Sequence, residues 1–200
     1  MVNIKKGAMF GLDARIALAI YGALSVISGA ALYSAIKTSK ATALLTDMRE
    51  TSKAWEAYLL DTGSDLPPYN TTGGINFRDM TGLVEDTGIT NWKGPYTSLE
   101  KHSSYPKALK HPLFKGEVHL MSIQDSSWGG SVDWGTAICT DDKDCSLWVY
   151  IDKVTSSYHK QIDEMVDSGD GDSAGNYRWV TLSDAWDDRI FLKVGPYSRP

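Results

Sequence analysis

Residues 16–36 carry no charged side chain, and this run limits the possible folds of the chain more than any other feature. The run is long enough to cross a bilayer as an α-helix, which takes about 20 residues. Lys5 and Lys6 precede the run. The positive-inside rule therefore keeps the N-terminus cytoplasmic and places the rest of the chain on the far side of the membrane.

Helical periodicity continues beyond this run without a glycine or proline break. Apolar residues recur at a spacing of three to four positions, and they are Leu44, Leu45, Met48, Trp55, Tyr58 and Leu59. We therefore predict one helix over residues 10–60, apolar all round in its first half and amphipathic in its second. A helix of that length is unusual in a globular domain.

Two simpler explanations of the apolar run are a plain signal anchor and a cleaved secretory signal peptide. A secretory peptide is cut after its apolar run near small residues, and the Gly-Ala-Ala sequence at residues 29–31 could mimic such a site. Asp13 and Arg15 argue against both explanations, because they lie at the start of the run, where a charge is costly without a partner.

The stretch GAMFGLD at residues 7–13, followed by the apolar run, resembles the leader and N-terminal helix of type IV pilins and type II secretion pseudopilins. In that family a prepilin peptidase removes a short basic leader on the cytoplasmic face of the membrane and methylates the new N-terminus. The resemblance implies a cut between Ala8 and Met9, which makes Asp13 the fifth mature residue, where the family has glutamate. A cut after Gly7 restores the glycine that the family prefers, but it loses this match.

Three helix residues match family positions that serve subunit assembly: Asp13, Ala19 and Gly22. The Asp13 carboxylate would neutralise the new N-terminal amine of a neighbouring subunit, because each charge is costly alone in lipid. Ala19 and Gly22 are small and permit close packing of membrane helices. Two alternatives stay open: Arg15 pairs with Asp13 within one helix, or the segment is a generic transmembrane helix rich in alanine and glycine.

The composition changes after the predicted helix. Residues 61–74 are rich in Gly, Pro, Asn, Thr and Asp, which indicates a loop, and residues 78–88 indicate a short helix or turn. The sequence WKGPY at residues 92–96 resembles the W-x-G-P-Y signature that precedes the first strand of major pseudopilins, with Trp92 and Tyr96 as core anchors. The D-P-W-G pattern that follows in that family is absent, so the choice between pilin and pseudopilin stays open.

Four later segments are rich in Val, Ile, Leu, Trp and Tyr and are bounded by Gly, Asp or Ser, as strands are. They span residues 117–123, 146–154, 176–182 and 189–194. A further helix is predicted over residues 156–166, with Tyr158, Ile162, Met165 and Val166 on one side. An antiparallel sheet packed on the amphipathic half of the long helix gives an α+β fold, which is the pilin architecture that the resemblance implies.

The expected domain organisation has three parts. Residues 1–8 form the prepilin leader, and residues 9–60 form the pilin helix with a transmembrane segment over about residues 16–36. Residues 61–200 form a globular pilin-like domain on the far side of the membrane.

Cys139 and Cys145 are the two cysteines of the chain, and neither has further Cys or His residues at zinc-site spacing. A disulfide is the better interpretation if the domain is exported, and two free thiols if it is cytosolic.

An acidic, glycine-rich run follows the predicted helix 156–166 and contains Asp167, Asp170 and Asp172. Closely spaced carboxylates are the hard oxygen ligands that Ca²⁺ prefers, so calcium is a candidate cofactor. The alternative is a solvated turn whose Asp and Asn side chains cap the backbone. A second acidic group would add ligands if it folds nearby: Asp184, Asp187 and Asp188.

The residues do not suggest an enzyme. The histidines are scattered without partners at metal-site spacing, and they are His102, His111, His119 and His159. The formal net charge is −5, and loss of Lys5 and Lys6 with the leader leaves 18 basic against 25 acidic residues, a charge of −7. Bulk electrostatics therefore disfavour nucleic acid as a partner.

The sequence thus predicts a structural subunit of a type IV pilus or a type II secretion pseudopilus. Its expected partners are further copies of itself, other pilins, prepilin peptidase, the assembly machinery and the bacterial inner membrane. The domain is expected in the periplasm before assembly, and in a pilus or periplasmic pseudopilus afterwards. The alternatives are an anchored binding domain that does not polymerise and an anchored periplasmic enzyme.

Overall fold

A computed structural model gives the fold of the chain. It describes residues 9–69, 76–126, 128–131, 137, 139, 144–181 and 188–197. Contacts divide the chain into two units, residues 1–40 and residues 41–200, and helix α1 contributes to both.

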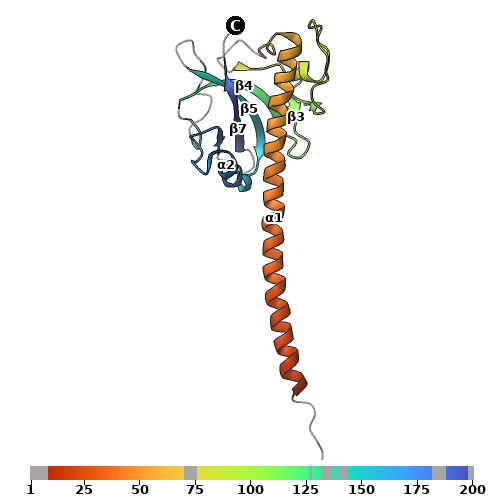
Figure 1. Cartoon of the computed structure of the whole chain (residues 1–200), viewed down its shortest axis with the longest axis vertical. Coiled ribbons are helices and arrows are strands. Elements are labelled where there is room, and N and C mark those ends of the chain that lie inside the picture. The colour runs from red at the N-terminus through yellow and green to blue at the C-terminus, as the bar shows by residue number, and fades with distance from the viewer. Residues whose placement is uncertain are drawn as a thin grey trace, which may run out of the picture. The chain divides into compact units, whose positions relative to one another are not determined.

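Helix α1 spans Met9–Thr62, which confirms the predicted long N-terminal helix (Figure 1). Gly63 ends it in the left-handed region, at φ 69°, and donates its N–H to the Leu59 carbonyl at 2.9 Å. A glycine just past the last turn is the common way to end a helix, because no Cβ opposes the positive φ.

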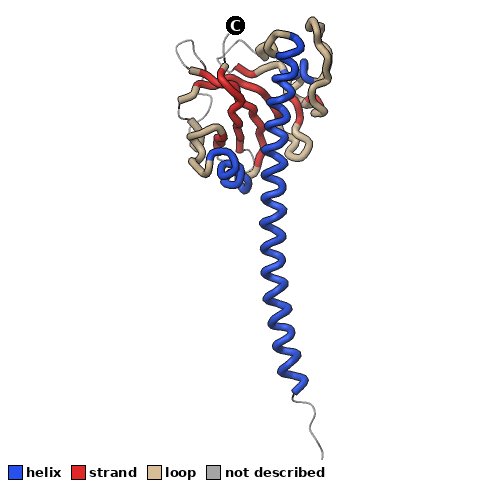
Figure 2. The backbone as a smooth tube through the Cα atoms, viewed as in Figure 1, coloured by secondary structure: helices blue, strands red, loops and turns tan. Residues whose placement is uncertain are grey.

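The second unit also contains one antiparallel sheet (Figure 2). Its strands are β1 (Asn76–Phe77), β2 (Glu100–Lys101), β3 (Leu109–Lys110), β4 (Glu117–Gln124), β5 (Cys145–Val154), β6 (Tyr177–Val180) and β7 (Asp188–Pro196). The order is β2-β3-β4-β5-β7-β6, and β1 pairs with β4. The four predicted strands correspond to β4, β5, β6 and β7.

One face of the sheet packs on residues 41–62 of α1, so the predicted α+β fold is confirmed. Alternate residues along each strand point to this face. The buried side chains that meet there include Leu44, Leu45, Met48 and Tyr58 from α1, and Leu120, Val149, Ile151 and Ile190 from the sheet.

The opposite face of the sheet is also buried, which the sequence did not predict. Trp128, Trp148 and Phe191 cover it, with Trp128 centred 5.0 Å from Trp148 and 4.9 Å from Phe191. The Arg178 guanidinium lies 4.9 Å from the centre of Trp128 and 5.2 Å from that of Trp148. It also donates to the Ser126 carbonyl at 2.7 Å, so this buried cation is satisfied.

The predicted helix at residues 156–166 consists of a 3-10 turn, Ser156–Tyr158, and helix α2, His159–Asp167. Its buried residues are His159, Ile162 and Asp163. Met165, which was predicted on the same side of the helix as Ile162, is 39% exposed. A second 3-10 turn, η1 (Met80–Leu83), lies within the predicted short helix or turn at residues 78–88.

The WKGPY segment anchors η1 to the core. Trp92 Nε1 donates to the Gly82 carbonyl at 2.7 Å, and Tyr96 packs edge-on against Tyr58 with ring centres 5.7 Å apart. A Cβ at Gly94 would lie 2.6 Å from the Trp92 ring. Glycine is therefore required where the chain folds this tightly between the two aromatic rings.

Candidate functional site

The N-terminal part of α1 exposes large apolar side chains on all sides. Leu18 is 72% exposed and Val26 is 74% exposed. The remaining ones are Leu12, Ile16, Ile20, Tyr21, Leu24, Ile27, Leu32, Tyr33 and Ile36. A helix that is apolar all round has to be covered by protein or lipid.

This helix is long and apolar enough to cross a membrane, judged by length and composition. The apolar stretch of this helix is not buried within the chain, whereas the core helix of a soluble protein is mostly buried. The segment therefore suggests membrane anchoring.

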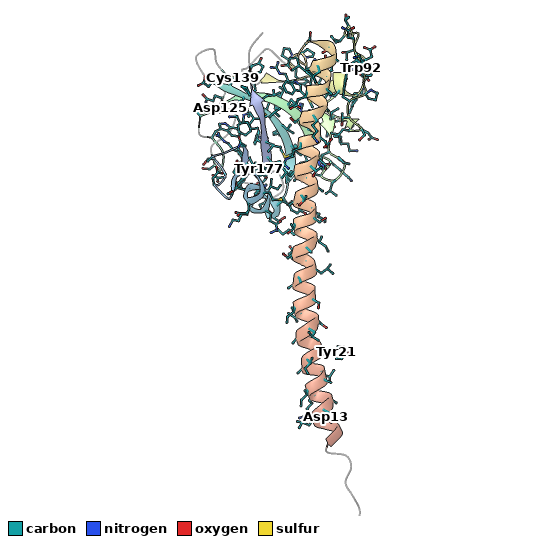
Figure 3. All side chains as sticks on the ribbon, in the orientation of Figure 1. Asp13, Tyr21, Trp92, Asp125, Cys139 and Tyr177 are labelled. Carbon is teal, nitrogen blue, oxygen red and sulfur yellow. A yellow bond between two sulfur atoms is a disulfide. The ribbon has the colours of Figure 1, made fainter. Side chains whose placement is uncertain are left out.

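The residues predicted to serve assembly lie on this exposed part of α1, and Figure 3 shows Asp13 and Tyr21 there. Asp13 and Arg15 have no ion-pair partner among the residues that the structure describes. A Cβ at Gly22 would meet nothing within 4 Å, so a neighbouring helix has room to approach. Gly7 and Ala8 of the predicted cleavage site lie outside the described residues.

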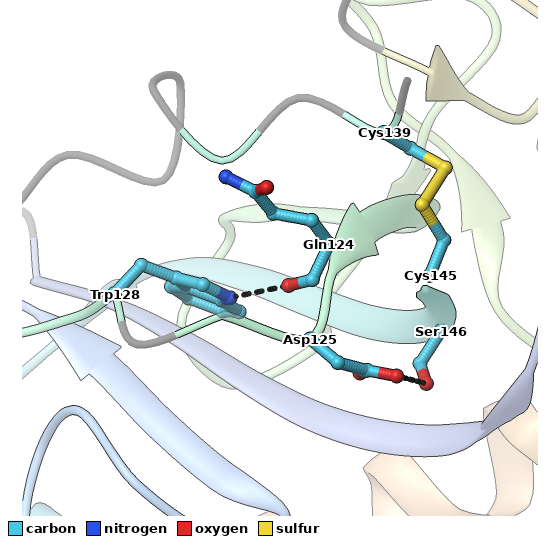
Figure 4. Close-up of a disulfide and its surroundings, with 6 residues drawn as sticks. All are labelled: Gln124, Asp125, Trp128, Cys139, Cys145 and Ser146. Atoms are coloured by element: carbon cyan, nitrogen blue, oxygen red, sulfur yellow. Dashed lines mark hydrogen bonds between the residues drawn. A yellow bond between two sulfur atoms is a disulfide. The ribbon is translucent and has the colours of Figure 1, made fainter. Parts of the chain in front are cut away.

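Cys139 and Cys145 form a disulfide with a Cα–Cα distance of 5.8 Å, which confirms the predicted bond (Figure 4). Cys145 begins β5, and both cysteines are buried. Near the bond, Gln124 donates its N–H to the Ala137 carbonyl at 3.1 Å. The bond thus links Cys139, in the connection between β4 and β5, to the first residue of β5.

Three carboxylates gather where α2 ends: Asp163, Asp167 and Asp170 each offer an oxygen within 4.8 Å of the others. Asp167 and Asp170 belong to the predicted set, and Asp163 replaces Asp172. Asp172 is not part of this group, and its backbone carbonyl accepts the Trp179 N–H at 3.3 Å. Its side chain lies against Gly130.

Asp167 holds the turn between α2 and β6. Its carboxylate accepts the backbone N–H groups of Asn176 at 2.8 Å and Tyr177 at 2.6 Å, and the Asn176 side-chain amide at 3.0 Å. Such bonds are expected if the turn is solvated and its Asp and Asn side chains cap the backbone, which is the alternative to a calcium site. Of the second acidic group, Asp188 pairs with a histidine instead, and Asp184 and Asp187 lie outside the described residues.

His159, the first residue of α2, is buried against residues of β6 and β7 that no sequence pattern connects to it. Its Nε2 lies 2.9 Å from Asp188 Oδ2, and its Nδ1 lies 3.3 Å from the Tyr177 hydroxyl. The Trp179 ring stacks on the imidazole with centres 5.3 Å apart. Burial lowers the pKa of His159 below its usual value, although Asp188 opposes the shift.

His111 connects the β3–β4 turn to α1. Its Nδ1 accepts the N–H groups of Leu113 and Phe114, both at 3.2 Å, and its Nε2 lies 3.3 Å from Asp47 Oδ2. Burial lowers the pKa of His111, and the Asp47 carboxylate partly offsets this shift. An accepting Nδ1 requires the neutral ring, so this residue serves as a turn cap.

His102 repeats this arrangement, with Nδ1 accepting the N–H groups of Ser104 and Tyr105 at 3.2 Å. The shared sequence signal is a histidine followed three residues later by an aromatic residue, as in residues 102–105 and 111–114. That repetition could have identified both turns. These histidines use their ring nitrogens for backbone or carboxylate contacts, which is a structural role.

Comparisons with protein-family models, with curated proteins and with solved structures find no match to this chain. Its fold, with a long apolar N-terminal helix, an antiparallel sheet and one disulfide, is consistent with a pilin-like or otherwise membrane-anchored subunit.

Proposed function

We propose that this chain is a membrane-inserted subunit that polymerises through its N-terminal helix into a type IV pilus or a type II secretion pseudopilus. One observation carries the proposal. The segment that exposes apolar side chains all round is continuous, in one helix, with the segment that builds the domain core.

The exposed apolar side chains of this helix have to be covered both before assembly and in the filament. Burial of each large apolar side chain stabilises by about 1.5–3 kcal/mol, so the membrane holds the subunit before assembly. In a filament the same side chains are covered by the helices of neighbouring subunits. Ala19 and Gly22 allow those helices to approach closely.

The proposal includes processing by prepilin peptidase. Cleavage between Ala8 and Met9 on the cytoplasmic face of the bacterial inner membrane leaves a methylated amine at Met9. Asp13 of one subunit then neutralises the amine of the next, with the globular domain in the periplasm. In this role the chain is a structural partner of the assembly machinery and of other pilins, and it performs no catalysis.

The other candidate is an anchored domain that does not polymerise. A simple anchor gains nothing from Asp13, since a carboxylate near an apolar helix segment is costly without a partner. The exposed Asp13 side chain, with no ion-pair partner among the described residues, therefore favours assembly over simple anchoring.

The first test is the N-terminus of the mature protein. Mass spectrometry of protein from the native host should find a chain that begins at Met9 and carries one N-methyl group. An intact Met1, or a start beyond Ala30, would instead identify an anchor or a secretory peptide.

The second test is substitution of Asp13. Asp13→Ala or Asp13→Asn leaves the amine of a neighbour unpaired where water is scarce, at a cost of about 2–4 kcal/mol per contact. We expect both variants to lose filaments in electron micrographs, and Asp13→Glu to retain them because it keeps the charge.

Two controls accompany this test. Immunoblotting shows whether each variant is processed, and circular dichroism shows whether the domain folds; both should match the unaltered protein. Normal filaments from Asp13→Ala would refute the charge-pairing mechanism and favour the simple anchor.

A further inference from the structure

The length of the chain holds one end of the second unit next to the bilayer. The apolar run ends at Ile36, and the second unit begins at Ala41. The chain between these two residues covers about 8 Å as a helix and at most about 18 Å when fully extended. Once residues 16–36 cross the membrane, the end of the unit at Ala41 therefore lies close to the lipid headgroups.

The turn between β3 and β4, residues 111–116, is held beside the first turns of α1 in this unit. His111 Nε2 lies 3.3 Å from Oδ2 of Asp47, which is on α1 shortly after Ala41. His111 Nδ1 accepts the N–H groups of Leu113 and Phe114 at 3.2 Å. The turn therefore has a fixed shape and a fixed place at the membrane-proximal end of the unit.

This turn exposes an apolar side chain next to lysines. Leu113 is 56% exposed at its tip, and Lys115 is exposed two residues later. A Cβ at Gly116 would clash with Asp152, so the exposed Lys153 of β5 also lies near the turn. Neither lysine forms an ion pair with any residue that the structure describes. Exposed apolar residues flanked by free lysines are typical of segments that lie in a membrane interface.

The charges of the unit also differ between the two sides of the sheet. The turn at residues 111–116 joins β3 to β4, whereas α2 leads to β6 at the opposite end of the strand order. Figure 1 shows β3 and α2 on opposite sides of α1. The acidic group of Asp163, Asp167 and Asp170 lies on the α2 side. A negatively charged surface therefore attracts the turn and repels the α2 side, which sets the tilt of the domain.

We propose that the turn at residues 111–116 docks on anionic phospholipid headgroups of the membrane in which the same chain is anchored. Leu113 enters the interface, and the ammonium groups of Lys115 and Lys153 contact lipid phosphates. The inference deepens the proposed function, because it rests on membrane insertion of residues 16–36 and gives the subunit a defined orientation before assembly.

The short connection favours lipid over a second copy of the chain as the occupant. The membrane is always within reach of the turn, since both belong to one anchored molecule, and the effective concentration of lipid is therefore high. A second copy has to diffuse to the same surface. The lysines add about fivefold each to binding at an anionic membrane surface.

Spin labelling of the full-length chain in lipid nanodiscs tests the docking. A label on Leu113→Cys reports on the tip of the turn, and a label on Leu60→Cys is the matched control, because Leu60 is 85% exposed near the other end of α1 in this unit. The native cysteines form a disulfide and do not take up the label. In nanodiscs of phosphatidylglycerol, the label at position 113 should collide less with a water-soluble nickel chelate than the label at position 60, and more with oxygen. In nanodiscs of phosphatidylcholine this protection should be largely lost.

Three identical substitutions test the role of the lysines. Lys115→Gln and Lys153→Gln should each lower the ratio of docked to undocked turn about fivefold in phosphatidylglycerol. Lys53→Gln is the control, because Lys53 is exposed but lies about 18 Å further along α1 than Ala41. That distance exceeds the Debye length of about 8 Å at physiological salt. The control should therefore change the ratio by less than about twofold.

Four results would overturn the proposal. The first is equal nickel access at positions 113 and 60 in phosphatidylglycerol, and the second is equal protection of position 113 in both lipids. The third is an effect of Lys53→Gln as large as that of Lys115→Gln. The fourth is protection that appears only in assembled filaments, which would assign the turn to a neighbouring copy.

Failure of the docking and failure of the proposed function give different results. The nanodisc measurements need neither filaments nor leader cleavage, and Asp13→Ala should leave the protection of position 113 unchanged. A chain that does not insert into nanodiscs would refute the membrane insertion on which both depend. A chain that inserts but leaves position 113 open to the nickel chelate would refute the docking alone.

Discussion

Leu44 and Leu60 offer a matched test of how α1 serves the globular domain. Both are leucines of one helix, but Leu44 is 1% exposed in the core against the sheet, and Leu60 is 85% exposed. Leu→Ala changes helix propensity similarly at both sites. The difference between the two variants therefore isolates burial.

The expected loss follows from the burial of Leu44. Leucine-to-alanine changes in a packed core cost about 2–5 kcal/mol, from lost transfer free energy and from the cavity left behind. For a domain of this size, each kcal/mol lowers the melting temperature by about 2–4 °C. We expect Leu44→Ala to cost about 3 kcal/mol and Leu60→Ala less than about 0.5 kcal/mol.

The assay is thermal unfolding of the full-length chain in mild detergent, followed by near-ultraviolet circular dichroism. The Trp128–Trp148 pair lies on the opposite face of the sheet from α1 and reports loss of tertiary packing. Leu60→Ala serves as the control for expression and detergent effects.

Equal melting temperatures for Leu44→Ala and Leu60→Ala would refute the reasoning. They would mean that the second half of α1 does not belong to the domain core. A large loss in Leu60→Ala alone would mean that Leu60 is covered by another subunit under the conditions of the assay.

Two further predictions concern the disulfide and His111. Replacement of Cys139 and Cys145 by alanine should lower the unfolding free energy by about 2 kcal/mol, because the bond closes a short loop; an unchanged urea midpoint would contradict this. Burial lowers the pKa of His111 below 6.5 in the folded protein, so the unfolded chain binds the proton more readily. Stability from this residue is complete above pH 6.5 and is lost as the pH falls through the folded pKa. His111→Asn keeps an acceptor for the turn N–H groups and should make the free energy of unfolding fall less as the pH is lowered. Urea titrations at several pH values measure this dependence, and the same dependence in the variant would exclude His111 as its cause.

The sequence predicted the elements with strong periodicity. A charge-free run followed by apolar residues at helical spacing identified α1, and segments rich in β-branched and aromatic residues identified β4, β5, β6 and β7. The strands β1, β2 and β3 have two residues each, so they are too short to show any period.

The second core layer was beyond the reach of sequence patterns. Trp128 lies in a connection and Arg178 in β6, and no spacing links the two. Their contact depends on the pairing of β6 with β7, which brings residues far apart in the chain together. A lone arginine in a strand gives no sign that two indole rings enclose it.

Asp163 shows a different limit. The predicted metal ligands begin at Asp167, the last residue of α2, and continue into the glycine-rich run, so the prediction did not include a residue inside the helix. The helical spacing does indicate that Asp163 is buried, since Ile162 and Asp163 follow His159 by three and four residues and lie on the same face of α2. An acid beside an apolar residue on the buried face of a helix indicates a partner or a ligand.

Strand β6 connects the acidic turn to the aromatic layer on the opposite face of the sheet. It has four residues and lies at the end of the strand order, where a short strand is weakly held. Asp167 fixes its first residue, Tyr177, and the next residue, Arg178, reaches the rings of Trp128 and Trp148. A change in the turn therefore alters the position of the guanidinium between these rings. For this reason, Asp167→Asn, which weakens the bond to the Tyr177 N–H, should change the near-ultraviolet circular dichroism of Trp128 and Trp148; an unchanged signal would contradict this coupling.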